Sequence, residues 1–178
     1  MPHINFEFKA RTNNLLHLEN KLLQLKPEFI GEDYQTDTYF NIEKGRLKLR
    51  EGNIENSLIY YERQNAANAK LSEIILYKYI ADPSLKEILI KVHGIKVVVN
   101  KTRRIYFIEN VKFHFDTVKP LGTFVEVEAI DNTGIIGIEK LKEQCTKYAD
   151  FFSINSSDYI SLSYSDLLLE NEKREKFI

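Results

Sequence analysis

A run of alternating cations and leucines stands at Arg46-Leu47-Lys48-Leu49-Arg50. In a β-strand, successive side chains point to opposite faces, so the two leucines would enter a core while the three cations share the other face, about 6.5 Å apart. Neighbouring charges at that separation repel by about 0.6 kcal/mol in water and about 2.5 kcal/mol at an effective dielectric of 20. The run therefore indicates either a solvated cationic strand or an enclosed face that needs an anion.

Other stretches with strand periodicity repeat this plan of one apolar and one charged face. Arginine and lysine neutralise phosphoryl oxygens, whereas carboxylates supply the hard oxygen ligands that Mg²⁺ and Mn²⁺ prefer. If the strands close into a barrel, the pattern favours a polyphosphate bound with a divalent metal; in an open sheet, the same residues would be solvated. The charges are Lys9, Arg46, Lys48, Arg50, Arg63, Lys101 and Arg103 on the positive side and Glu7, Asp116, Glu126 and Glu128 on the negative side.

Hydrophobic periodicity predicts the elements that would carry these faces, many antiparallel strands with helices covering their apolar side. The expected strands span 4–9, 34–42, 46–50, 57–63, 74–80, 96–108, 111–118 and 123–130, with a loop at 64–69. The expected helices are one capped by Thr12, one from Asp82-Pro83 to Gly94, one capped by Asn132 or Thr133, and a short one at 158–169. Cys145 lies on an apolar helix stripe and is expected in the core.

Bulk composition limits the classes of protein to consider. The 178 residues predict one domain over 1–170 followed by a charged tail at 171–178. With 25 basic and 26 acidic residues, the formal net charge of −1 does not suggest nucleic-acid or membrane binding. No apolar run is long enough to span a bilayer, no signal peptide is apparent, and a single cysteine fits a reducing compartment, so a cytoplasmic location is expected.

The ordered motifs resemble the CYTH superfamily of triphosphate tunnel metalloenzymes. Phe6-Glu7-Phe8-Lys9 is similar to the family's Glu-x-Glu-x-Lys signature, and the likeness extends from about residue 4 to 170. Asp37-Thr38-Tyr39-Phe40 and Tyr60-Tyr61-Glu62-Arg63 look most like the class IV adenylyl cyclase branch. The remaining matching segments are 45–51, 99–104, 114–116 and 121–128.

The resemblance implies an α+β fold, an antiparallel eight-stranded closed β-barrel with helices packed on its outside. It further implies conversion of ATP to 3′,5′-cyclic AMP and pyrophosphate with Mg²⁺ or Mn²⁺. In that family pattern Lys9, Arg46, Lys48, Arg50, Arg63, Lys101 and Arg103 bind the triphosphate, with Lys9, Arg103 and Asp116 in catalytic roles, and Glu7, Glu126 and Glu128 hold metal. A triphosphatase acting on an inorganic or organic triphosphate and a non-catalytic polyphosphate- or nucleotide-binding domain remain alternatives, and the last helix either caps the tunnel or joins two copies as a homodimer.

Two residues deserve separate hypotheses. Asn5 stands where the signature has its first glutamate; an amide oxygen can coordinate a metal but brings no negative charge, so weaker metal binding, altered metal preference or lost turnover are all open. His114 is interpreted as a hydrogen-bonded structural residue in preference to a ligand or base.

Overall fold

The structure is a computed structural model that describes residues 3–63, 70–80 and 82–175. Within these residues, the chain forms eight strands, four α-helices and one short 3₁₀ helix, Ser156–Asp158. The strands are β1 His3–Arg11, β2 Glu28–Phe40, β3 Arg46–Glu51, β4 Ser57–Arg63, β5 Lys70–Lys78, β6 Ile95–Ile108, β7 Val111–Val118 and β8 Gly122–Asp131. The helices are α1 Leu15–Leu23, α2 Pro83–His93, α3 Ile138–Phe152 and α4 Tyr164–Glu175.

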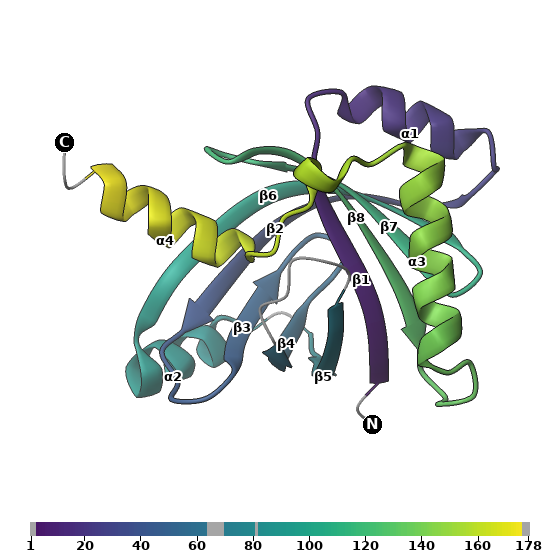
Figure 1. Cartoon of the computed structure of the whole chain (residues 1–178). Helices are drawn as coiled ribbons and strands as arrows, with labels where there is room; N and C mark the ends of the chain where they lie inside the picture. The colour runs from purple at the N-terminus through teal and green to yellow at the C-terminus, as the bar shows by residue number, and fades with distance from the viewer. Residues whose placement is uncertain (1–2, 64–69, 81, 176–178) are drawn as a thin grey trace.

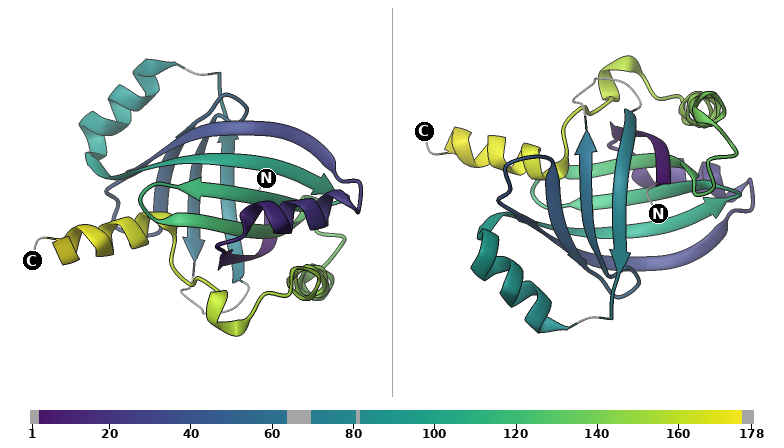
Figure 2. Two further views of the ribbon diagram at one scale, coloured as in Figure 1. Left: turned by 90° about the horizontal axis from the view of Figure 1, so that it is seen from above. Right: turned by 90° about the horizontal axis from the view of Figure 1, so that it is seen from below.

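The strands form one closed antiparallel barrel in the order β1-β5-β4-β3-β2-β6-β7-β8. Closure is made by β1, which pairs antiparallel with β5 on one side and with β8 on the other. Figure 1 shows α1 and α3 outside one side of the barrel and α4 leaving at the opposite side, and Figure 2 looks at the same barrel from above and below. The predicted α+β fold, a closed eight-stranded barrel with external helices, is confirmed.

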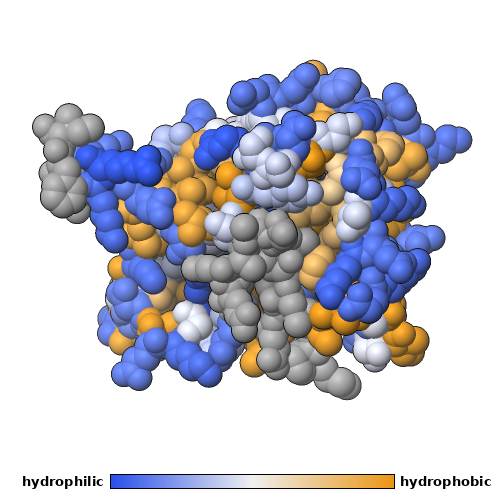
Figure 3. All heavy atoms as spheres, in the orientation of Figure 1, coloured by the Kyte–Doolittle hydropathy of each residue, from blue (hydrophilic) through white to orange (hydrophobic). Residues whose placement is uncertain are grey.

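Strand alternation separates an apolar outer layer from a charged interior. The outward residues of β1, β7 and β8 pack against α1 and α3 in the main core, which includes Phe8, Phe113, Phe115, Val125, Val127, Leu18, Leu22, Leu141 and Phe152. Cys145 belongs to this core and is 1% exposed, as predicted. On the face seen in Figure 3, hydrophilic side chains cover most of the solvent side of α1 and α3. The same strands must therefore turn their polar side chains inward.

Helix α2 confirms its predicted signals but covers less of the barrel than expected. The Asp82 carboxylate accepts a hydrogen bond from the Ser84 amide at 2.8 Å, and Gly94 ends the helix with φ +69°. Leu89 is buried, whereas Ile88 and Val92, which lie at helical spacing on the same apolar stripe, are 57% and 68% exposed. The helix lies against the ends of β2 and β3, so only one edge of its stripe meets a partner.

Three helix starts were placed wrongly, and hydrogen bonds of side chains explain each shift. Thr12 does not cap α1; its hydroxyl accepts from the Asn14 amide at 3.1 Å, and Asn14 is the residue that precedes the helix. Neither Asn132 nor Thr133 caps α3, because the Asp131 carboxylate accepts from the backbone amides of 133, 134, 136 and 137 and holds this segment as a loop. The third shift concerns the last helix.

The last helix begins later and ends later than the predicted 158–169. It begins at Tyr164, next to a reciprocal pair in which the Asp166 amide donates to the Ser163 hydroxyl and the Ser163 amide donates to the Asp166 carboxylate. Residues 171–175 of the expected tail are helical, and 176–178 lie outside the described residues. The predicted loop at 64–69 also lies outside them. In the described part of the chain, no helix combines the length and apolar character needed to cross a membrane.

Candidate functional site

The barrel encloses a cavity of about 740 Å³ whose walls carry charges of both signs. Most of the cations and carboxylates that the sequence singled out line it, so the enclosed alternative holds and the solvated one does not. These are Lys9 and Glu7 on β1, Lys48 and Arg50 on β3, Lys101 and Arg103 on β6, and Glu126 and Glu128 on β8. Lys112 and His114 on β7 and Glu55 from the turn between β3 and β4 join them.

Asp37 on β2 gathers three of the cations around one carboxylate. Its Oδ2 lies 2.7 Å from Lys101 Nζ and 3.0 Å from Lys48 Nζ, and its two oxygens accept from Arg50 at 2.9 and 3.1 Å. Burial alone would raise the pKa of Asp37, but the three cations outweigh it and hold that pKa well below its usual range. Burial also lowers the pKa of Lys101 well below its usual range. The repulsion expected within the cationic face is thus offset by an internal anion, Asp37, whose position in the motif 37–40 does not reveal this role.

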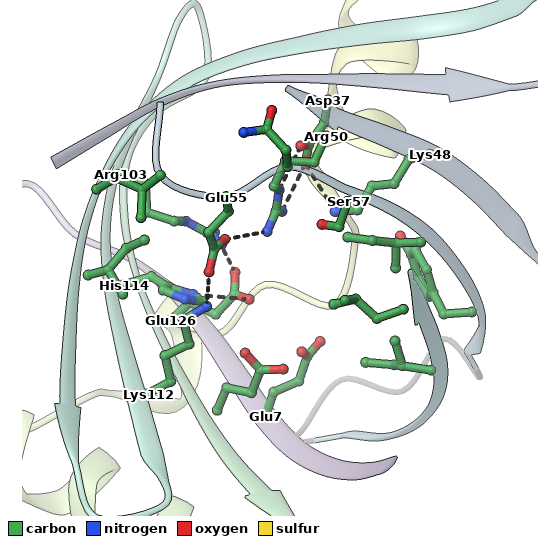
Figure 4. A pocket seen from close by; sticks show the side chains of 18 of the residues that line it. Glu7, Asp37, Lys48, Arg50, Glu55, Ser57, Arg103, Lys112, His114 and Glu126 are labelled. Atoms are coloured by element: carbon green, nitrogen blue, oxygen red, sulfur yellow. Dashed lines mark hydrogen bonds and ion pairs between the residues drawn. The ribbon is translucent and has the colours of Figure 1, made fainter. Parts of the chain in front are cut away.

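Glu55 places a second carboxylate between cations of opposite walls. It accepts from Arg50 Nη1 at 2.9 Å and also pairs with Lys112 across the cavity, as Figure 4 shows. The turn that carries it is held by the Asp33 carboxylate, which accepts from the amides of Ile54 and Glu55 at 2.9 and 3.0 Å. Burial opposes ionisation, but Lys112 and Arg50 lower the pKa of Glu55 far below its usual value. Neither strand nor helix periodicity points to this residue, because it lies in a turn.

Because Glu55 occupies a position where two cations could bind a phosphoryl oxygen, it should compete with a bound polyanion. We expect Glu55→Gln to bind inorganic tripolyphosphate about tenfold more tightly at low salt, since one negative charge leaves the cavity while the side-chain shape is kept. Titration calorimetry would measure this, with the exposed Glu43→Gln as the matched control. Weaker binding by Glu55→Gln than by the control would show that Glu55 instead orients the two cations.

Arg103 is fixed by a carboxylate behind the cavity wall. Its guanidinium makes a two-point contact with Asp116, with Nε–Oδ1 at 2.7 Å and Nη2–Oδ2 at 2.5 Å. The Tyr164 hydroxyl, at the start of α4, donates to the same carboxylate at 2.7 Å. Asp116 is fully buried and saturated by these donors, so its geometry suits holding Arg103 in place, and its predicted catalytic role stays a prediction.

The start of α4 also engages the tunnel cations at one end of the barrel. The ring of Tyr164 lies 4.2 Å from Lys9 Nζ, and Asp166 pairs with Arg46 Nη2 at 2.7 Å. Arg46 is therefore partly buried against α4, beside the tunnel and away from the main cavity lining. The backbone of Arg63 belongs to β4, but its side chain lies outside the described residues.

The wall of the cavity that β1 and β8 form is rich in carboxylates. Glu7 and Glu128 stand opposite each other in the β1–β8 ladder, and Lys9 stands opposite Glu126. Burial, opposed by Lys112 and reinforced by Glu7 and Glu126, raises the pKa of Glu128 to about 7. Glu126 behaves differently: burial would raise its pKa, but Lys9 at 3.4 Å and Arg103 at 3.5 Å lower it. Glu126 is thus paired with cations in this structure. Glu128, in contrast, lies close to the carboxylates of Glu7 and Glu126.

The side chains around Glu128 include oxygen atoms that could bind a divalent metal. Asn5 is fully buried, its amide nitrogen donates to Glu128, and its oxygen has no hydrogen-bond partner among the described residues. In that part of the chain, no three His, Cys, Asp or Glu side chains gather into a preformed metal site. Magnesium commonly takes only one or two carboxylates and completes its shell with phosphate oxygens and water. The residues therefore fit a metal bound together with a phosphorylated ligand, with Glu7 and Glu128 as its protein donors.

His114 differs from its sequence interpretation as a hydrogen-bonded structural residue. It is 1% exposed, and neither ring nitrogen has a hydrogen-bond partner among the described residues. Burial and, to a smaller extent, Arg103 lower the pKa of His114 to about 4, so the ring is neutral at physiological pH. No periodicity signal could have revealed this, because the missing partners are a property of the assembled tunnel.

Comparison with known proteins identifies the family of the chain. Residues 3–148 match the model of the CYTH domain. Among solved structures, the PH1012 protein from Pyrococcus horikoshii is 25% identical, with a TM-score of 0.79 over 92% of this chain and 98% of that one. A Vibrio parahaemolyticus protein provisionally named an adenylate cyclase is 19% identical, with a TM-score of 0.75 over 94% and 99% of the two chains.

A third structure, HpAC1 from Hippeastrum, is an adenylyl cyclase candidate described as having a dominant triphosphatase activity. It is 13% identical, with a TM-score of 0.63 over 96% of each chain. At these two lower identities, the likeness shows the fold alone. A search of curated proteins found no significant match. The family model covers most of the sequence, and the enclosed charged barrel agrees with it: the chain belongs to the CYTH domain family.

Proposed function

We propose that this chain is an adenylyl cyclase of the class IV type, which converts ATP to 3′,5′-cyclic AMP and pyrophosphate with Mg²⁺ or Mn²⁺. The observation that carries the proposal is the enclosed cavity, in which the cations of β3 and β6 form one wall and the carboxylates of β1 and β8 form another. A triphosphate with its metal matches both walls, whereas a simple anion matches only the first.

In this proposal, the cations of the cavity bind the triphosphate and the carboxylates bind the metal. The triphosphate would be bound by the cations that line the cavity, and Glu7 and Glu128 would hold the metal. These cations are Lys9, Lys48, Arg50, Lys101 and Arg103. The ribose 3′ oxygen would form a bond to the α-phosphorus while the α–β phosphoanhydride bond breaks, releasing pyrophosphate and the 3′ proton. A bound metal would neutralise charge on the departing pyrophosphate. Asp116 would keep the Arg103 guanidinium aimed at the phosphates by its two-point contact.

The cavity also has a surface suited to the organic part of a nucleotide. Ile54, Ile105, Phe107 and Ile130 belong to its lining together with Asn56 and Asn132. Apolar walls with a few polar groups are typical of sites for organic ligands. Inorganic triphosphate would leave these apolar walls without a partner, so the lining supports a nucleoside triphosphate as substrate.

The direct test is the product formed from ATP with Mg²⁺ or Mn²⁺. We expect cyclic AMP and pyrophosphate in equal amounts, and we expect Arg103→Gln to reduce the rate at least 100-fold because it removes a fixed cation from the cavity. Arg104→Gln is the matched control, since Arg104 is the next residue on β6 and pairs with Glu19 of α1 outside the tunnel. Equal losses in both variants would contradict a role for Arg103 in the site.

A triphosphatase is the second candidate, because the same lining of cations and carboxylates could hold a triphosphate for attack by water. The same cations would hold the triphosphate while water attacks the γ-phosphorus, giving orthophosphate. Orthophosphate without cyclic AMP in the same assay would reject the cyclase and support this reading. Nucleotide binding without turnover under either metal would point to a binding domain.

Asn5 provides a separate test of the metal proposal. We expect Asn5→Glu to lower the melting temperature of the metal-free protein, because a new carboxylate would be buried against Glu128. Mn²⁺ should then raise the melting temperature of the variant more than that of the unchanged protein. Asn13→Glu, at an exposed position, is the control. A variant whose melting temperature does not respond to Mn²⁺ would argue against a metal at this wall.

A further inference from the structure

His114 is a buried polar side chain whose hydrogen bonds are unmade. It lies on β7 between Lys112 and Asp116 and belongs to the cavity lining, and Figure 4 shows it among Arg103, Glu126 and Lys112. Both ring nitrogens are shielded from solvent and lack a hydrogen-bond partner among the described residues. Folded proteins rarely leave such groups unpaired, because the loss of hydration is not compensated. Because His114 belongs to the lining, a molecule bound in the cavity can supply the missing partner.

The surroundings decide which nitrogen is available and what it can bind. Nδ1 lies 3.7 Å from the Glu126 carboxylate, beyond a hydrogen bond but close enough to favour a proton on that nitrogen. In the neutral ring, Nε2 then carries a lone pair. The nearby donors are already engaged, because Arg103 binds Asp116 and Lys112 binds Glu55. Ionised phosphate oxygens have no proton to donate and would repel the lone pair of Nε2.

We propose that Nε2 of His114 accepts a hydrogen bond from a hydroxyl group of the ligand. This rests on the proposed function and narrows its substrate class to a triphosphate that carries a hydroxyl near its phosphates, as the ribose of a nucleotide does. His114 thereby distinguishes a nucleoside triphosphate from inorganic triphosphate. It contributes specificity, while the arginines and lysines contribute the affinity for phosphate.

The experiment pairs removal of the ligand hydroxyls with removal of the imidazole. Titration calorimetry with Mg²⁺ would compare α,β-methylene-ATP, its 2′,3′-dideoxy counterpart and inorganic tripolyphosphate, since the methylene bridge prevents cyclisation. In the unchanged protein, we expect loss of the hydroxyls to weaken binding about five- to tenfold, the effect of one hydrogen bond. In His114→Phe, the two nucleotides should bind alike, and tripolyphosphate should bind as before.

Further variants separate specificity from structure. His114→Gln keeps an acceptor and should retain part of the discrimination, and His17→Phe, on the exposed side of α1, should retain all of it. The melting temperature of metal-free His114→Phe should be unchanged or higher, because two unpaired polar atoms are removed.

Three results would overturn the inference. Equal affinity of the two nucleotides for the unchanged protein would show that no hydroxyl is recognised, and the proposed function would survive. Loss of Mn²⁺ binding by His114→Phe without nucleotide would assign the lone pair to a metal. Failure of both nucleotides and of tripolyphosphate to bind the unchanged protein would remove the proposed function together with the inference.

Discussion

Replacing Asp37 by asparagine is expected to lower the free energy of unfolding by about 3–5 kcal/mol, the usual cost of removing one partner from a buried ion cluster. The substitution preserves size but leaves Lys48, Arg50 and Lys101 without their shared carboxylate, which now lies 2.7 to 3.1 Å from their nitrogens. Asp37 is 2% exposed, so the asparagine that replaces it would be equally buried and would bring no negative charge to the three cations. Urea denaturation at low salt would measure the loss.

A polyanion should restore much of this stability, because its phosphate oxygens can replace the missing carboxylate. Inorganic tripolyphosphate is therefore expected to raise the melting temperature of Asp37→Asn more than that of the unchanged protein. Asp150→Asn, at an exposed position on α3, serves as the control and should alter stability by less than about 0.5 kcal/mol. If Asp37→Asn were as stable as this control, the cations would not depend on Asp37.

Replacing Glu128 by glutamine is expected to stabilise the metal-free protein by an amount that grows as the pH rises from about 4.5 to 7. The pKa of Glu128 rises from 4.5 in the unfolded chain to about 7 in the folded protein, so the folded state holds the extra proton in this interval. Stability therefore falls with rising pH between these two pKa values, where the unfolded chain has released the proton and the folded protein still holds it. The shift corresponds to about 3 kcal/mol above pH 7, and glutamine does not incur this cost.

The comparison must use the difference between variant and unchanged protein, because His114 acts in the opposite direction. Its pKa falls from 6.5 to about 4 on folding, so its own contribution raises stability as the pH increases over that range. Glu139→Gln, at an exposed position on α3, is the control for the exchange of a glutamate for glutamine. Saturating Mn²⁺ should abolish the advantage of Glu128→Gln, since a metal takes over the role of the proton. A difference that does not vary with pH would contradict the raised pKa.

Short-range sequence patterns were sufficient to predict which faces of the barrel strands carry the charges and where α2 begins and ends. Period-two alternation along β6 puts Lys101 and Arg103 on one face and Arg104 on the other; in the structure the first two line the cavity and Arg104 pairs with Glu19. Turn and cap chemistry placed the ends of α2 correctly, because Asp82 and Gly94 act through their immediate neighbours. The starts of α1, α3 and α4 were misplaced because Thr12, Asp131 and Ser163 form local turns that compete with capping.

The amino-acid sequence by itself determined which side chains face inward, because a strand permits only two directions for a side chain and the apolar one had to meet the helices. Only the tertiary structure decided how the inward charges pair. Barrel closure brings Glu55 from a turn to Lys112 on the far wall, sets Asp37 among three cations and leaves His114 without a hydrogen-bond partner in the described part of the chain. Pairing, burial and the resulting pKa values depend on distances across the tunnel, and no spacing along one strand contains them.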